Sequence, residues 1–560
     1  MRSLSGVRVP RIVWLGGAAV GVGVAVELTR SFWAFARWYW GQTRHQRHEE
    51  GGLRELVRRQ GPPPVPLWGN SRLLLRRGYY RTLHRYCMER PVGVFWVGRS
   101  PFVVVSDERL VQRVLASAAY VKPRYFGYRS RAMKMALEVH RASERVRVLT
   151  EGKRQADAED NAANPTRRAL IALMEQSTPD MVAASMQLLG ELERAPLSPE
   201  GDFATVQAHY VRLNCWILFR MRLPAAEALR IGRAISGAGD EFSLRMVTPY
   251  RGWFHGLANL RYFAHIVAIL RFGRRLAAQL DRTAGTWVHA WVGRVGRIGK
   301  LGKVLGLLMA ATQTVPVAAI WMLHLVSTHD RVRQRLQEEI RECMERDRET
   351  RSADGSVDDT AANASDLSAN PAGQLLLLTA AQLRHLPYAD AVIRESLRLY
   401  PPFPILQRQA VADDQLGEVF IPAGQVVSVV PWVMHHHPAY WRDVECFEPE
   451  RFLGDDHDRH GDAPSDYCYV PFARGQRMCA GSSLALAELK VLLVCAVLRW
   501  GEWASVQPDT GRELFRGGDV NGTAESVHFP PLSMKPLGIG LRPRHPHRDE
   551  KRLADGDTRR

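Results

Sequence analysis

The chain has 560 residues, and 46% of them are hydrophobic, which is enough to bury a large core. Its formal net charge of +18 suits nucleic acid, an anionic membrane surface or an acidic protein as partner. The sequence contains no zinc-finger, RRM or KH pattern, so we expect no nucleic acid. The seven cysteines are scattered without CxxC spacing, which disfavours a disulfide framework or zinc site and favours a protein facing the cytosol.

Residues 1–40 are predicted to form a membrane anchor. Ile12 to Val26 is an uncharged apolar run, somewhat shorter than the roughly 20 residues that span a bilayer. Ser31 to Trp40 mixes aromatic and basic side chains, which is typical of the headgroup zone. A cleaved signal peptide is the competing interpretation, because the run also has the length of a signal's apolar region. We favour the retained anchor, since the aromatic belt would have little purpose after cleavage.

The remaining chain divides by composition. Residues 41–75 are a basic, proline-rich hinge with a stiff extended backbone. Phe95 to Ser106 has the composition of strands, and helical patterns dominate from 165 to 345. We therefore predict a mainly α domain with small β-sheets over residues 76–545. Within it, residues 346–372 are a polar surface insertion, and residues 546–560 are a disordered charged tail.

One cysteine lies in a segment suited to chemistry at its sulfur. The stretch from Pro471 to Gly481 reads Pro-Phe-Ala-Arg-Gly-Gln-Arg-Met-Cys-Ala-Gly and precedes a run with helical spacing. Cys479 therefore lies before a helix N-terminus, where free N–H groups and the dipole lower a thiol's pKa. Gly475 and Gly481 permit tight turns and close approach to a flat ligand. Arg477 could pair with an acidic group on that ligand.

The stretch from Phe472 to Gly481 matches Phe-x-x-Gly-x-Arg-x-Cys-x-Gly and resembles the haem-binding signature of the cytochrome P-450 family. Ala473 departs from the family, which prefers Gly, Ser, Asn or His there. The resemblance runs from the proline hinge to about residue 545. It implies the mainly α cytochrome P-450 fold and haem b as cofactor, with Cys479 as the axial iron ligand. The other cysteines are interpreted as buried small hydrophobic residues.

Further motifs precede this cysteine at the family's spacing. Glu395 and Arg398 stand at i and i+3 of a predicted helix, and Arg451 lies in an element resembling the family's Pro-x-Arg-Phe. The resemblance implies that these three form a buried ion network behind the haem. Losing one partner would cost roughly 3–5 kcal/mol. His435 to His437 could ligate a metal, but the triplet lies where the family carries His-Arg-Asp-Pro-x-x-Trp, so we expect no separate metal site.

Two arginines are implied to meet the haem propionates. Arg408 matches the family's propionate arginine, which extends from a strand. Arg168 corresponds to the arginine of the family's Trp-x-x-x-Arg helix. Asn164 stands where the tryptophan is usual, so Arg167 is the alternative.

Leu305 to Leu325 is the candidate oxygen-activating helix. Ala310 to Thr314 aligns with the family's Ala-Gly-x-Asp/Glu-Thr, which implies that the Thr314 hydroxyl helps to deliver protons. Gln313 replaces the acid and cannot relay a proton by ionising, which leaves a water-mediated route. The competing interpretation of Thr314 is a helix threonine bonding its own i−4 carbonyl. Pro316 must free a backbone carbonyl and bend the helix.

The resemblance implies a monooxygenase that inserts one oxygen atom from dioxygen into a C–H bond. Electrons would come from NADPH through NADPH-cytochrome P-450 reductase, with cytochrome b5 as a second candidate donor. The anchor, charge and hinge resemble the endoplasmic-reticulum type, whose catalytic domain faces the cytosol. Such a location selects apolar substrates.

We expect a sterol, either hydroxylated or demethylated, because the run from Thr314 to Trp321 is similar to the branch of sterol hydroxylases and prostacyclin synthase. A fatty-acid or eicosanoid hydroxylase is the main alternative. Gln313 also leaves open an isomerase or dehydratase that rearranges a peroxide without reductase. A non-catalytic haem sensor is the alternative from another class, and it would have no need of Thr314.

Overall fold

A computed structural model of the chain describes residues 26, 29–30, 33–38, 70, 79–97, 100–123, 165–196, 201–247, 256–283, 287–292, 296–353, 379–403, 405–453, 466–507, 536 and 538–544. Most of the predicted anchor and hinge, residues 354–372 of the predicted insertion, and the predicted tail lie outside these residues.

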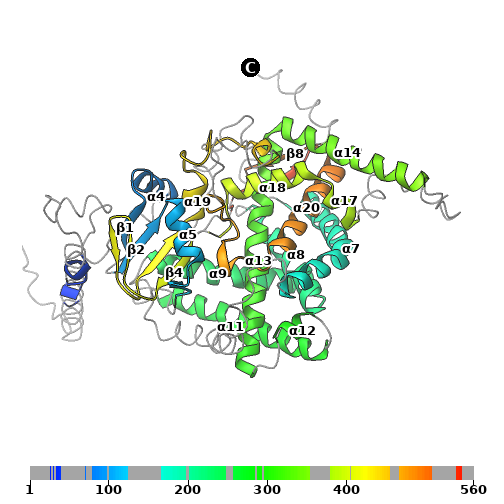
Figure 1. Cartoon of the computed structure of the whole chain (residues 1–560). Coiled ribbons are helices and arrows are strands. Elements are labelled where there is room, and N and C mark those ends of the chain that lie inside the picture. Colours follow the sequence, from blue (N-terminus) through cyan, green and yellow to red (C-terminus); the bar gives the residue numbers. More distant parts are fainter. Residues whose placement is uncertain are drawn as a thin grey trace, which may run out of the picture.

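Helices dominate the described chain (Figure 1). The longer ones are α4 (Tyr79–Met88), α5 (Glu108–Ala116), α7 (Pro165–Arg194), α8 (Phe203–Phe219), α9 (Ala225–Val247), α11 (Gly256–Arg282), α13 (Arg297–Thr328), α14 (Asp330–Ala353), α18 (Pro387–Leu399) and α20 (Ser482–Trp500). Short helical segments are α12 (Trp287–Val292), α17 (Ala380–Arg384), α19 (Pro431–His435), η3 (Pro449–Phe452) and η5 (Gly475–Arg477). The expected mainly α fold is confirmed, and α14 extends helix over residues 346–353 of the predicted insertion.

Three small sheets accompany the helices. The largest has the order β1-β2-β7-β4-β3, built from β1 (Val92–Val97), β2 (Ser100–Val105), β7 (Val426–Val429), β4 (Leu406–Ala410) and β3 (Tyr120–Val121). Of its neighbouring strands only β2 and β7 run parallel. The pairs β5 (Asp414–Leu416) with β6 (Val419–Ile421) and β8 (Trp503–Val506) with β9 (Gly540–Pro543) form two-stranded sheets. The five-stranded sheet lies to one side of the helices (Figure 1) and presents Arg408 from β4.

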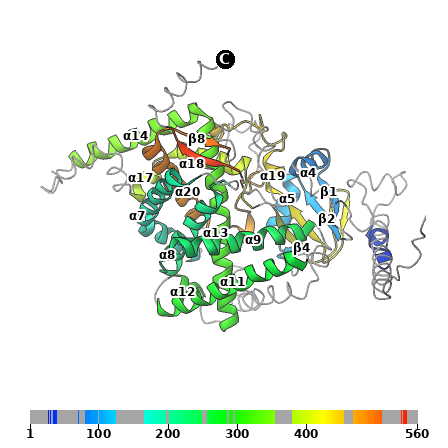
Figure 2. The same ribbon diagram turned by 180° about the vertical axis from the view of Figure 1, so that it is seen from behind.

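Helix α13 passes through the middle of the helical part in both views (Figure 2), with α8, α9, α11, α18 and α20 against it. Its second half, from Val315 to Ser327, is buried throughout. Among the described residues it alone is long and apolar enough to cross a membrane, with a mean hydropathy of 1.7. Because 56% of that window is buried inside the protein, its apolar character is that of a core helix.

Two aromatic side chains of the predicted anchor pack on the sheet. The Phe35 and Trp96 rings meet edge to face with centroids 4.5 Å apart, and Trp38 contacts the same ring. Trp38 is buried, whereas Trp33 is 64% exposed. The location of this stretch in a headgroup zone stays a prediction, and within the protein Phe35 and Trp38 contact the sheet through Trp96. Stacking on a buried tryptophan removes their apolar area from water without a membrane.

Candidate active site around Cys479

A tight loop places Cys479 immediately before helix α20. The Cys479 N–H donates to the Phe472 carbonyl at 2.9 Å, and the Met478 N–H donates to the Gly475 carbonyl at 3.0 Å. Helix α20 begins at Ser482 with Gly481 as its N-cap, as the sequence predicts. Cys479 is accessible to solvent, although the surrounding chain lies close enough to its sulfur to desolvate a thiolate. Of the other cysteines, Cys446 is also exposed, against the expectation that it is buried.

The two loop glycines have different roles. Gly475 has φ +74°, and a Cβ there would lie 2.6 Å from the Leu115 carbonyl oxygen at the end of α5. Gly481 has φ −89°, and its Cβ would meet only the Cys479 sulfur, at 4.0 Å. Packing of the chain itself therefore requires Gly475, whereas Gly481 stays available for the predicted approach of a ligand.

Gly475→Ala is expected to shift the cysteine loop, because α5 backbone blocks the added methyl group and the left-handed backbone costs about 1–2 kcal/mol more. The thermal midpoint of unfolding, followed by far-ultraviolet circular dichroism, should fall. Gly481→Ala is the matched control and should keep the parent midpoint. Equal midpoints for the two variants would contradict this assignment.

Ala473 occupies the left-handed region, with φ 57°. This conformation is unfavourable for a residue with a Cβ and is most readily adopted by Gly, Asn and Asp. The alanine that departs from the family motif therefore affects the backbone conformation at this position as well as the size of the side chain. The buried Ala473 methyl packs in the cluster around the five-stranded sheet, which offsets part of the cost.

The pKa of the Cys479 thiol is shifted in the direction opposite to the one expected from the sequence. Burial raises the pKa of Cys479, and a hydrogen bond from the Gly481 N–H opposes that rise. The net lowering of the pKa predicted from the helix N-terminus is not found for the protein chain by itself, because desolvation of the thiolate outweighs the Gly481 hydrogen bond. The backbone donor that favours the anion is nevertheless in place.

Arg408 has the features of an anion ligand. It is buried, and its Nη1 donates to the Gln407 carbonyl at 3.0 Å. Its Nη2 is buried without a hydrogen-bond partner in the described part of the chain. Burial, and after it the positive charge of Arg477, lower the pKa of the Arg408 guanidinium. Two converging cations with an unsatisfied buried donor fit a carboxylate-bearing ligand, as a haem propionate is.

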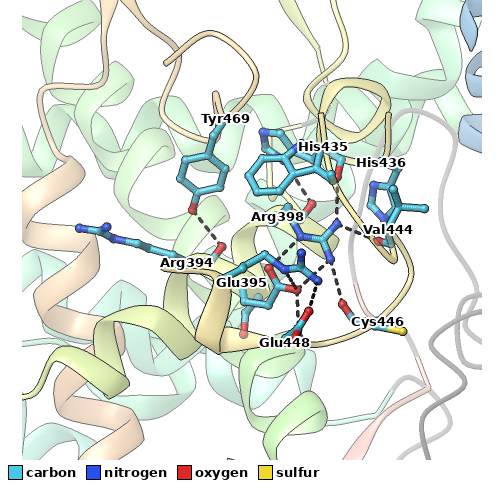
Figure 3. A network of polar contacts seen from close by, with 12 residues as sticks. Arg394, Glu395, Arg398, His435, His436, Val444, Cys446, Glu448 and Tyr469 are labelled. Carbon is cyan, nitrogen blue, oxygen red and sulfur yellow. Dashed lines mark hydrogen bonds and ion pairs between the residues drawn. The ribbon is translucent and has the colours of Figure 1, made fainter. Parts of the chain in front are cut away.

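The structure brings the predicted ion network together (Figure 3). Arg398 donates to both Glu395 oxygens at 2.8 Å, and both side chains are fully buried. Arg451 reaches Glu395 from η3 at 3.1 Å. The remaining Arg398 donors meet the carbonyls of His435, Val444 and Cys446 at 2.8–3.0 Å. One carboxylate thus fixes two arginines, and Arg398 fixes the chain that leads towards the cysteine loop.

His435, which the sequence suggested only as a metal ligand, bridges the network and the loop. Its Nδ1 contacts the Arg398 carbonyl at 3.2 Å, and its Nε2 accepts the Val470 N–H at 2.9 Å. Burial, with a contribution from Arg398, lowers the pKa of His435 to about 3. The ring is therefore neutral, with the proton on Nδ1, and its Nε2 holds the backbone of Val470 at the start of the cysteine loop. Only the pairing of distant segments reveals this role.

On α13, the Thr314 hydroxyl donates to the Ala310 carbonyl at 3.0 Å, which is the competing interpretation from the sequence. Its oxygen can still accept a hydrogen bond, and the side chain is partly exposed. The side chain of Gln313 packs against Gly239 of α9, and its Nε2 is buried without a partner among the described residues. Of Gln313 and Thr314, Thr314 is thus the residue whose side-chain oxygen is accessible to a further hydrogen bond.

Sequence reasoning missed a buried acid on α20, the helix that follows the cysteine loop. Glu488 of α20 is buried, and burial raises the pKa of its carboxyl to about 8, while a hydrogen bond with Asn214 of α8 opposes the rise. Its Oε1 has no partner in the described chain. A glutamate in an apolar helix gives no sequence signal for such a partner 274 positions away in α8.

We expect Glu488 to make the fold less stable as pH rises. A carboxyl whose pKa is raised on folding costs nothing below its unfolded value, about 4.3, and destabilises increasingly until the folded value is passed. Glu488→Gln should remove on the order of 3–5 kcal/mol of pH dependence between about pH 5 and about pH 9. Urea unfolding at both pH values measures it, and parallel profiles for parent and variant would rule it out.

Arg168 and its alternative Arg167 both lie in the first turn of α7. Their side chains fall outside the described part of the structure. The choice between them remains a prediction from the sequence.

Residues 300–511 match the family model described as Cytochrome P450. The chain is similar to "Probable cytochrome P450 4d20" of Drosophila melanogaster, 36% identical over 167 residues, which are 30% of this chain and 29% of that protein. It is 32% identical to "Cytochrome P450 71D94" of Mentha gracilis over 24% of this chain and 27% of that protein. It is 30% identical to "Cytochrome P450 4V2" of Mus musculus over 32% and 29%.

The aligned part of the chain thus spans less than a third of each of these relatives. The segment matched by the family model includes the Thr314 helix, the Glu395 network, Arg408 and Cys479. The features predicted from the cytochrome P-450 resemblance between Thr314 and Cys479 thus fall inside one continuous match, and residues 300–511 are similar to the cytochrome P450 family.

Proposed function

We propose that this protein is a haem-thiolate monooxygenase that inserts one oxygen atom from dioxygen into a hydrophobic lipid. The observation that carries the proposal is the exposed Cys479 thiol at the α20 N-terminus, with a hydrogen-bond donor aimed at its sulfur. The unpartnered, buried Nη2 of Arg408 supports haem b in particular, since that cofactor has carboxylate substituents.

In the proposed arrangement Cys479 would hold the haem iron, and Arg408 and Arg477 would bind a propionate. When bound, the haem supplies the dioxygen chemistry, with the thiolate donating electron density to the iron. The Gly481 N–H stabilises negative charge on the sulfur. The Glu395 network and His435 keep the loop in place, so that the ligand sulfur is fixed before the cofactor binds.

Thr314 is proposed to hold a proton-carrying water with its hydroxyl oxygen. Thr314→Ala should lower the rate of product formation by about 100-fold, the size of a typical proton-transfer contribution, with more NADPH consumed per product. Thr312→Ala is the matched control. Its hydroxyl makes the same i−4 bond, to the Leu308 carbonyl at 2.7 Å, but is fully buried. Equal losses in the two variants would show that both hydroxyls are only structural.

An apolar substrate is supported by the open side of α13. Gly306, Ala310 and Thr314 follow at four-residue intervals and so form one row on the helix. A Cβ on Gly306 would meet no atom within 4 Å, and the neighbouring Met309 is 39% exposed. The three residues of this row carry no charged side chain, which favours substrates that partition into a membrane.

Within that class we propose a sterol, with a fatty acid or eicosanoid as second candidate. Spectral titration of the purified protein with both lipid classes distinguishes them. A sterol that binds the haem-loaded protein should give a high-spin spectral shift, whereas shifts with fatty acids alone would overturn the sterol assignment. None of the relatives' names above specifies a substrate.

Electrons are proposed to come from NADPH through cytochrome P-450 reductase, with cytochrome b5 as a further donor, at the endoplasmic-reticulum membrane. The net charge of +18 supports docking of an acidic partner. The decisive assay follows consumption of NADPH and dioxygen in the presence of reductase and lipid. Product that depends on both would support the monooxygenase. Turnover of a lipid hydroperoxide without NADPH would instead favour the isomerase, which the glutamine at position 313 leaves open.

A further inference from the structure

We infer that Gln207 of α8 is a positioning residue for the Thr314 segment, because its side-chain amide replaces the backbone hydrogen bond that Pro316 removes from α13. The part played by Thr314 rests on the proposed function. The replacement of the hydrogen bond stands on the geometry alone.

Proline inside a helix leaves one carbonyl without its usual donor. Pro316 lacks an N–H, so the carbonyl of Thr312, four residues earlier, receives no bond from it. Thr312 is fully buried. A carbonyl at such a position needs a donor from the protein, since leaving it unpaired costs more than most single contacts contribute.

Gln207 supplies that donor from the neighbouring helix. Its Nε2 donates to the Thr312 carbonyl at 3.4 Å, and its Oε1 accepts the Ser236 hydroxyl of α9 at 2.8 Å. Gly232 of α9 gives the amide room, because a Cβ there would lie 3.3 Å from the Gln207 Oε1. The amide is buried and engaged at both ends, so its direction is fixed.

The neighbouring carbonyl, that of Ala311, receives a similar side-chain hydrogen bond but does not depend on it for a donor. Asn214, seven residues further along α8, donates to the Ala311 carbonyl at 3.4 Å. The residue four positions after Ala311 is Val315, which carries an N–H of its own. Helix α8 therefore contacts α13 at two successive carbonyls, just before Thr314, and only one of them depends on a side chain for its donor.

The consequence lies at Thr314, two residues past the Thr312 carbonyl. A helix with a missing bond can bend or open at that point. The α8 contacts hold the backbone on the buried side, while Thr314 is partly exposed. The position and direction of the Thr314 hydroxyl are thus set from α8, through the Thr312 carbonyl that Gln207 binds.

A double-mutant cycle tests this inference. Gln207→Leu keeps the size of the side chain and leaves the Thr312 carbonyl without a donor. Pro316→Ala restores a backbone N–H for the same carbonyl. Alone, Q207L should lower the thermal midpoint, followed by circular dichroism, by about 1–4 °C. The Q207L/P316A protein should differ from P316A by less than about 1 °C.

A second measurement separates positioning from stability. The C–O stretching band of the reduced protein under carbon monoxide senses polar groups on the oxygen side. Q207L should shift or split that band relative to the parent. The Q207L/P316A protein should show the same band as P316A alone. Asn214→Leu is the control, because P316A offers no new donor to the Ala311 carbonyl and should not rescue it.

Equal losses from Q207L in both backgrounds would reduce Gln207 to a packing residue and overturn the inference. A lower midpoint with an unmoved carbon monoxide band would overturn the positioning role. If Q207L does not fold, Ser236→Ala replaces it, because this change removes the contact that orients the Gln207 amide but keeps the amide itself. It should lower the thermal midpoint by less than Q207L, and P316A should again remove the difference. Absence of the thiolate-type Soret band in the parent would defeat the proposed function while leaving the midpoint cycle valid.

Discussion

Cys479→Ser is expected to abolish oxygen insertion while the protein still folds. A serine hydroxyl is neither deprotonated nor electron-rich enough to replace the thiolate, so the reduced carbon monoxide complex should lose the long-wavelength Soret band of a haem-thiolate protein. Cys479 contributes little to the core because it is exposed, so the thermal midpoint of the haem-free chain should stay near that of the parent.

Cys446→Ser is the matched control for this experiment. Cys446 is the other exposed cysteine in the described chain, and its contact with the ion network is through its backbone carbonyl, which the substitution retains. This variant should keep both the Soret band and the activity. A C479S protein that retained the thiolate-type band would remove the basis of the proposed function.

Glu395→Gln should give the largest loss of stability. The glutamate is fully buried between Arg398 and Arg451, with N···O distances of 2.8 and 3.1 Å. The amide keeps one acceptor but loses the charge, so two arginines are left without their buried counter-ion. We expect about 3–5 kcal/mol to be lost from the free energy of unfolding, together with haem retention. Urea unfolding and the haem content of the purified protein measure the two effects.

Glu448→Gln provides the comparison at the edge of the same network. Its carboxylate pairs with Arg451 at 3.0 Å, but its side chain is 50% exposed. Solvent screens such a pair, so the loss should stay below about 1 kcal/mol. Similar losses for E395Q and E448Q would show that burial does not govern this network.

The features that local spacing predicted are those whose partners lie close along the chain, whereas the Glu395–Arg451 contact, 56 positions apart, was predicted only from the family resemblance. Cys479 stands two residues before the Gly481 N-cap, and Glu395 with Arg398 is an i,i+3 pair. Their geometry follows from helix spacing and turn chemistry alone. The same reasoning placed a proline inside the buried helix and required that a carbonyl be freed.

The tertiary structure decided which distant side chain forms a hydrogen bond with each group that the local sequence leaves unpaired. Gln207 lies 105 positions from the carbonyl it serves, and Val470 lies 35 positions from His435. It also brought Phe35 and Trp38 against Trp96, and at Cys479 the burial of the thiol raises its pKa more than the Gly481 hydrogen bond lowers it. Desolvation and partner choice depend on what packs around a group. Residue spacing along the sequence determines neither the desolvation nor the partner, because any polar residue on a facing helix could supply the hydrogen bond.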